Sequence, residues 1–178
     1  MPVLAPLLCA RYPVNAMNIT DQLRAEVFIE ELASREKSGK MENLNVITLT
    51  SDHTVGTRPG WPTPRAMVAD NDLALGRIVE AITKSRFWPH SLILVVEDDA
   101  QNGVDHIDGH RTVALAIGPH IRRGVLDSNH YNHTSMVRTI QEIFRIPPRT
   151  RFLKSARAMT SIFTPETDLT PYLSLIHI

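Results

Sequence analysis

The chain lacks the features that mark several common classes of protein. Its 178 residues include a single cysteine, Cys9, which excludes an internal disulfide and a thiolate zinc cluster, so any metal site must use imidazole and carboxylate ligands. Lys and Arg together number 19, as do Asp and Glu, and this balance argues against a nucleic-acid binder held by bulk charge. No apolar run approaches about 18 residues, so we expect no membrane-spanning helix. The apolar segment 2–9 is too short for a signal peptide and lacks a basic start.

The rest of the sequence alternates helical and strand-like patterns. Residues 21–36 are expected to form a helix that Thr20 caps and that ends before Gly39. Its buried stripe is expected at Leu23, Val27 and Leu32. The other expected elements are strands over residues 45–50, 92–96 and 112–117 and helices over residues 67–85 and 135–144. Strand, helix and strand at this spacing predict parallel pairing through a right-handed crossover, and therefore an α/β fold.

A cluster of charged residues follows the apolar run 92–96. It holds five acids, two histidines and an arginine between Glu97 and Arg111, at the exit of a buried strand, where open α/β sheets bind ligands. Packing carboxylates together costs on the order of several kcal/mol per ion unless a cation or protons neutralise them. We therefore expect Asp98 and Asp99 to bind a metal ion. The alternative is a solvated acidic turn.

Two more candidates lie on the loop that follows this acidic pair. His106, next to Asp105, is a possible ligand in the same metal site. Arg111 is suited to clamping a phosphate or carboxylate bidentately, and it is equally suited to neutralising Asp105 or Asp108.

The remaining candidates lie at the ends of other elements. Asp52-His53 follows the expected strand 45–50, and it is either a metal or phosphate contact or a purely structural pair. His133 begins the last helix, whose N-terminus favours a nearby anion, although a simple cap by Thr134 or Ser135 is the alternative. Asn71-Asp72 is expected on an exposed helix face.

Five stretches, taken in their order along the chain, carry a family resemblance. They are Asp52-His53-Thr54, Val68-Ala69-Asp70-Asn71-Asp72, the stretch from Glu97 to Asp108, Ala116-Ile117-Gly118-Pro119, and the stretch from Tyr131 to Ile140. This set resembles the phosphoesterase branch of the alkaline phosphatase superfamily over about residues 20–170. It is most similar to bacterial proteins that join a β-propeller to an alkaline-phosphatase-like domain, and more distantly to acid phosphatases and phospholipases C.

The resemblance implies an α/β/α sandwich with a mostly parallel sheet and metal ligands at the carboxyl ends of its strands. It makes Asp98 and Asp99 the ligands of one or two divalent ions (Zn, Mn, Ca or Mg), and His53 and His133 phosphate or metal contacts that serve as catalytic residues. From the residues themselves we add Asp52 and His106 as candidate ligands and Arg111 as a candidate catalytic residue. The implied activity is metal-dependent hydrolysis of a phosphate ester, either a small molecule or a phospholipid head group, by an exported protein. The alternative is a non-catalytic α/β domain that a metal loop stabilises, attached to a binding propeller.

The sequence departs from the superfamily pattern in its nucleophile. Such enzymes carry a Ser or Thr nucleophile at a helix start upstream of these motifs, and Ser51, Thr54 and Thr57 are too loosely placed to fill that role. We therefore expect residues 1–172 to be the C-terminal portion of one phosphoesterase domain, inactive by itself. Residues 173–178 are expected to be a non-native, adapter-derived tail, with an ordinary apolar tail as the alternative.

Overall fold

The computed structural model describes residues 5–13, 15–99 and 111–173. The chain divides into two compact units, Met1–Pro89 with Thr170–Ile178, and His90–Leu169. Short 3-10 turns complete the helices and strands of both: η1 (Ala5–Leu7), η2 (Ser51–His53), η3 (Trp88–His90) and η4 (Thr160–Ile162). No helix in the described part of the chain is long and apolar enough to cross a membrane.

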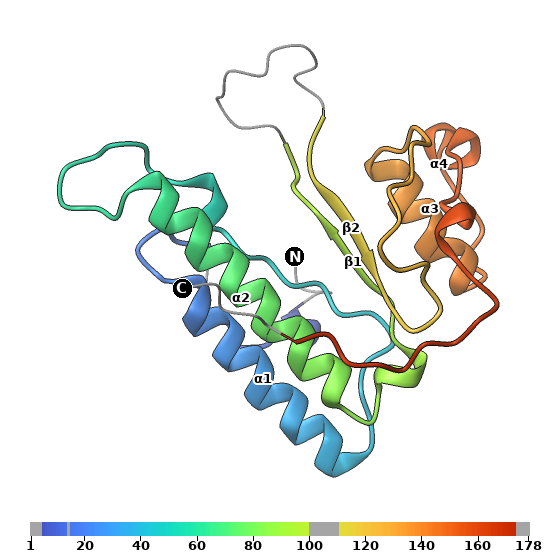
Figure 1. The fold of residues 1–178 in the computed structure, drawn as a ribbon, viewed down its shortest axis with the longest axis horizontal. Coiled ribbons are helices and arrows are strands. Elements are labelled where there is room, and N and C mark those ends of the chain that lie inside the picture. Colours follow the sequence, from blue (N-terminus) through green and yellow to red (C-terminus); the bar gives the residue numbers. More distant parts are fainter. Residues whose placement is uncertain (1–4, 14, 100–110, 174–178) are drawn as a thin grey trace. The chain divides into compact units, whose positions relative to one another are not determined.

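The first unit is built on two long helices, α1 (Asp21–Ser38) and α2 (Pro64–Lys84), which lie side by side (Figure 1). As expected, the Thr20 hydroxyl accepts the Leu23 N–H at the start of α1, and Gly39 ends the helix with a positive φ of 69°. The buried apolar side chains of the two helices are Ala25, Val27, Phe28, Leu32, Met67, Ala74, Ile78, Val79 and Ile82. The last described residues return to this unit, where Tyr172 meets the Trp88 ring edge to face at 6.1 Å.

The prediction that Leu23 belongs to the buried stripe of α1 is wrong. Leu23 is 45 % exposed, whereas Val27 and Leu32 are buried as predicted. The inward face of the first turn of α1 is taken by Asp21 and Arg24, which are both fully buried. At about 100° per residue, Leu23 cannot share that face with them.

The expected strand 45–50 does not form. Val46 is 85 % exposed, and this segment enters no β-ladder among the described residues. Its last residue, Thr50, instead directs its backbone N–H to the Asp21 carboxylate at 3.0 Å. A central strand would be buried on both faces, and this segment is not.

The second unit holds a two-stranded sheet of β1 (Ile93–Val96) and β2 (Ala114–Ile117), the only strands in the described residues. The strands pair antiparallel, with Ile93 opposite Ile117 and Val96 opposite Ala114 (Figure 1). The mixed α/β character is therefore confirmed, but the mostly parallel sheet of an α/β/α sandwich is not found there. The segment 45–50, which was the predicted parallel partner of β1, forms no ladder. Strand β1 instead pairs with β2, the strand that follows it in the chain.

One face of this sheet packs against the core of the second unit. That core consists of Ile121, Met159 and Ile162, with Leu92, Leu94, Ala116, Tyr131 and Met136 packed around them. Helices α3 (His133–Ile143) and α4 (Arg151–Ser155) lie beside each other (Figure 1). The buried Thr139 hydroxyl ties α3 to the segment before η4, because it donates to Ser135 O and accepts the Met159 N–H, both at 2.8 Å.

Gly118 follows β2 where two stretches of chain approach closely. A Cβ atom at this position would lie 2.9 Å from the backbone oxygen of Ser91 and 3.2 Å from Ile121 Cγ1. Backbone cannot give way as a flexible side chain can, so only glycine fits without a shift.

We predict that Gly118→Ala lowers the free energy of unfolding by roughly 1–3 kcal/mol, because the added methyl group overpacks this contact. Urea denaturation followed by circular dichroism measures the loss. Gly118→Ser should lose at least as much, and an Ala variant as stable as the unmodified chain would contradict the close approach.

A polar network closes the loop that precedes α3. The Asp127 carboxylate accepts a hydrogen bond from the hydroxyl of Ser161. It also accepts the backbone N–H of Asn129 at 2.9 Å and the side-chain amide of Asn129 at 2.6 Å. The Tyr131 hydroxyl lies 2.6 Å from the same Ser161 oxygen. These hydrogen bonds, led by that from Ser161, lower the pKa of Asp127 from 3.8 to about 2.

Because the folded-state pKa of Asp127 lies below its unfolded value, the stability it contributes is present above about pH 4. We predict that this contribution is lost as the pH falls from about 4 to about 2. Thermal unfolding followed across this range should show a smaller acid-induced loss in Asp127→Asn than in the unmodified chain. A carboxyl NMR titration of Asp127 near pH 3.8 would contradict the assignment.

Candidate functional site

The Asp21 carboxylate is the centre of a polar network in the first unit. It is fully buried at the first position of α1. One oxygen accepts the guanidinium of Arg24 at 2.9 Å and the N–H of Thr50 at 3.0 Å. The other accepts the N–H of Ser51 at 2.8 Å and the side-chain amide of Asn71 at 3.0 Å. Four donors therefore replace the water that burial removed.

Arg24 balances the charge of this carboxylate. The two groups form a buried ion pair, and the guanidinium also donates to the backbone oxygens of Ile19 and Ala16, at 2.7 and 3.0 Å. A buried charge without such partners would be strongly destabilising, so each member of the pair depends on the other.

Tyr12 lies near this ion pair and contacts the segment that leads into η2. Its hydroxyl donates to the backbone oxygen of Thr48 at 2.9 Å. Burial raises the pKa of Tyr12 to about 12, although the positive charge of Arg24 opposes the shift. The phenol therefore stays protonated, and able to donate, at neutral pH.

Asp70 on α2 joins the same network from the other helix. Its carboxylate accepts the N–H of Asp21 at 2.7 Å and the hydroxyl of Ser51 at 2.8 Å. Its backbone oxygen accepts the side-chain amide of Gln22, also at 2.7 Å. The start of α1, the turn η2 and the second turn of α2 are thus held together by hydrogen bonds.

The turn η2 carries the predicted pair Asp52-His53. Asp52 is partly buried and its carboxylate lies 3.4 Å from the amide nitrogen of Asn71. His53 is exposed, and its Nδ1 lies 3.1 Å from the backbone oxygen of Thr54. A carbonyl oxygen only accepts, so Nδ1 of His53 is the donor in this contact. Thr54 has a φ of 57°, a strained conformation that costs about 1–3 kcal/mol and that surrounding contacts must impose.

Asp98 and Asp99 follow β1 after one intervening residue, Glu97, and are both exposed. The backbone N–H of Asp99 donates to the side chain of Asp98 at 3.1 Å, so the two residues form a tight local turn. Arg111 is exposed beyond the other end of the loop. Residues 100–110, which include the predicted ligand His106, lie outside the described residues.

His133 is the first residue of α3 and is exposed. The cap of this helix is Asn132, and not Thr134 or Ser135 as expected. Asn132 accepts the N–H of Ser135 at 3.0 Å, and the Ser135 hydroxyl accepts the Asn132 N–H at 3.3 Å. This reciprocal pair is a capping box. The side chain of His133 is therefore not used in closing the helix end.

Some of these carboxylates have oxygens that could bind a divalent cation, and others do not. Asp21 does not fit, because four donors occupy its two oxygens and one of them is the positive Arg24. In the first unit Asp52 and His53 offer an oxygen and a nitrogen donor, and in the second unit Asp98 and Asp99 offer oxygen donors. Divalent cations such as Zn²⁺, Mn²⁺, Mg²⁺ or Ca²⁺ bind donors of these kinds. Within the described residues, no group of three or more His, Cys, Asp or Glu side chains converges.

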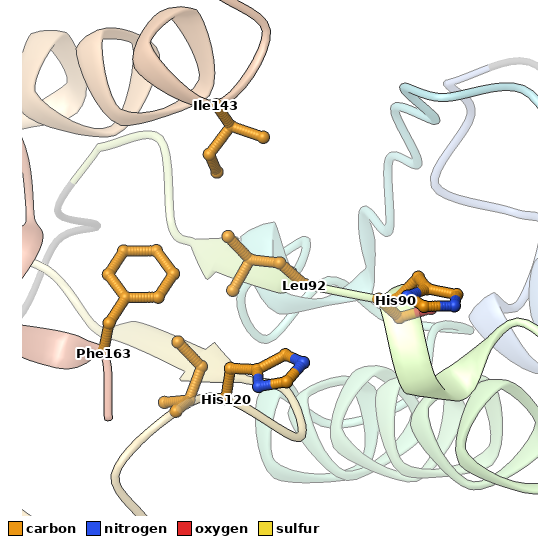
Figure 2. A pocket seen from close by; sticks show the side chains of 7 residues that line it. His90, Leu92, His120, Ile143 and Phe163 are labelled. Carbon is orange, nitrogen blue, oxygen red and sulfur yellow. The ribbon is translucent and has the colours of Figure 1, made fainter. Parts of the chain in front are cut away.

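The second unit also contains a pocket of about 270 Å³ at the start of β1. Figure 2 shows Ile143, Leu92 and Phe163 around it, with His120 and His90 to one side. The pocket is lined in part by the residues that lead into β1, whereas Asp98 and Asp99 come after the opposite end of that strand. It is therefore separate from the candidate ligands.

The comparison with family models identifies the class of protein. The model of the Phosphoesterase family matches residues 20–147, a range that contains every candidate residue. The chain belongs to the Phosphoesterase family, which supports hydrolysis of phosphate esters as its general activity. No curated protein and no solved structure matches the chain.

The residues that position the Asp52-His53 turn cannot be found from the local sequence pattern. That pattern shows Asp21 only as the start of a helix. The prediction that Asn71 lies on an exposed face is wrong, because its side chain contacts both Asp21 and Asp52. The one indication of a functional role for Asp70 and Asn71 is that both belong to a stretch that carries the family resemblance. Nothing in the local pattern indicated their partners, which lie about 20 and 50 residues away in the chain.

We predict that Asp21→Ala lowers the free energy of unfolding by about 3–5 kcal/mol, because Arg24 stays buried without its carboxylate. Urea denaturation followed by circular dichroism measures the effect. The matched control is Asp72→Ala, an exposed acid on α2, which should change stability by less than about 0.5 kcal/mol. Equal stability of both variants would contradict a central role for Asp21.

Proposed function

We propose that this chain supplies metal- and phosphate-binding residues of a phosphate ester hydrolase of the alkaline phosphatase superfamily. The observation that carries the proposal is the family match over residues 20–147. The geometry of the first unit supports it, since buried hydrogen bonds hold Asp52 and His53 on a strained, partly exposed turn. Strain of this kind is often found at functional sites.

The proposed metal ligands are Asp98, Asp99, Asp52 and His106. The ion would be Zn²⁺, Mn²⁺, Ca²⁺ or Mg²⁺, and when bound it would polarise the phosphoryl oxygens and activate a hydroxyl nucleophile. The adjacent Asp98 and Asp99 provide the negative charge that attracts the ion to the end of β1.

The proposed catalytic residues are His53, His133 and Arg111. With Nδ1 held by the Thr54 carbonyl, His53 presents Nε2 to a proton or a phosphate oxygen. His133 stands at the N-terminus of α3, where backbone N–H groups favour an anion. Arg111 is suited to offsetting charge on the nonbridging oxygens.

Three further parts of the proposal concern the protein to which the chain belongs. We propose that the nucleophile is supplied by sequence outside residues 1–172, in an exported protein that also carries a β-propeller. The substrate would be a small phosphomonoester or phosphodiester, or a phospholipid head group. Residues 173–178 would be non-native.

The central prediction concerns metal and phosphate binding by the 178-residue chain. After equilibration with Mn²⁺ and gel filtration, elemental analysis should find bound metal in the unmodified chain and none in Asp98→Asn/Asp99→Asn. Calorimetric titration should then show orthophosphate binding only when metal is present. Hydrolysis of p-nitrophenyl phosphate should be undetectable, because the proposal places the nucleophile outside residues 1–172.

The matched control is Asp72→Asn/Glu166→Gln, which removes two exposed acidic charges elsewhere and should bind metal normally. Unchanged metal content in the Asp98/Asp99 variant would overturn the ligand assignment. Metal that raises the melting temperature without any orthophosphate binding would favour the non-catalytic, metal-stabilised domain. Robust hydrolysis by the chain would overturn the proposal of an external nucleophile.

A further inference from the structure

We infer that Asn71 is a positioning residue for the Asp52-His53 turn, and that it acts by joining the carboxylates of Asp21 and Asp52 through one side-chain amide. The inference rests on the proposed function of Asp52 and His53. It concerns a residue that itself contacts neither metal nor substrate.

The contacts of Asn71 place one donor between two acids. Its Nδ2 lies 3.0 Å from an oxygen of Asp21 and 3.4 Å from an oxygen of Asp52. An amide nitrogen carries two hydrogens, so it can serve both acceptors at once. Without it, both carboxylates would lose a shared donor, and their mutual repulsion would favour rotation of the more exposed Asp52 away from the network.

Asp21 gives this bridge a fixed end. Its carboxylate is fully buried, is paired with Arg24, and accepts the N–H groups of Thr50 and Ser51, which lead into η2. The backbone at the start of the turn and, through Asn71, the side chain of Asp52 are therefore set by the same carboxylate. The orientation of His53, the next residue, follows from that of the turn.

Asparagine fits this role better than similar residues. An alanine would leave one Asp21 oxygen short of a donor, and an aspartate would place a further carboxylate between the two acids. A serine hydroxyl has one hydrogen and can satisfy at most one of the two acids. Asn71→Ala and Asn71→Ser should therefore both lose the bridge, although the serine variant keeps a polar group on α2.

The test follows the turn and the metal site separately by NMR on the full ¹⁵N-labelled chain. The His53 and Thr54 amides report on the turn, because they donate to Thr50 O and Ser51 O at 3.3 and 3.1 Å. In both Asn71 variants, hydrogen exchange at these two amides should be roughly tenfold faster, while exchange in the cores of α1 and α2 stays unchanged. The Mn²⁺ concentration that half-broadens the His53 ring signal should rise about tenfold. The control Asp72→Asn, the next residue on α2, should change neither quantity.

The outcomes separate this inference from the proposed function. If Mn²⁺ leaves His53 unaffected in the unmodified chain, the proposed metal role of the turn fails, and the exchange data still decide whether Asn71 holds it. If Mn²⁺ broadens His53 equally in the unmodified chain and in both Asn71 variants, the inference is overturned. It is also overturned if exchange quickens equally in the turn and in both helices, since Asn71 would then be a general stabiliser. Should Asn71→Ala fail to fold, Asn71→Ser decides.

Discussion

A carboxylate removed from water must find its donors within the protein, and the arrangement of the first unit depends on how Asp21 finds them. Its two oxygens accept a guanidinium, two backbone N–H groups and a side-chain amide, which come from α1, from the approach to η2 and from α2. Moving any of these segments would leave a buried charge short of partners. The same carboxylate that stabilises the helix pair therefore also fixes the turn of Asp52 and His53.

In the second unit, the carboxylate of Asp127 likewise obtains its hydrogen-bond donors from the protein. That carboxylate collects donors from Asn129 and Ser161, and so joins the loop before α3 to the segment that carries η4. In both units a buried or partly buried acid ties loops to helices, while the candidate functional residues His53, Asp98 and His133 are exposed at the ends of elements. The acids that protein donors satisfy therefore have a structural role in both units.

Local pattern predicted much of this structure. The caps of α1 at Thr20 and Gly39, the presence of α2 and α3, and the two strands of the sheet follow from short-range propensity and periodicity. The structure confirms these elements, with bounds shifted by a few residues from the expected ones. The family resemblance agrees with the match to the Phosphoesterase family. The expected strand 45–50 failed because a β-rich run forms a strand only if another strand pairs with it, and none of the described strands does. Leu23 failed because buried polar residues displaced it from the inward face.

The sequence by itself determined where the main helices form and both ends of α1, since each of these depends on neighbours a few positions apart. Tertiary structure alone decided that β1 and β2 run antiparallel and that Asp21, Asp70 and Asn71 hold the Asp52-His53 turn. Such contacts join residues that lie from about 20 to 50 positions apart in the chain. Which of these contacts form depends on which donors and acceptors come close together when the chain folds and buries them.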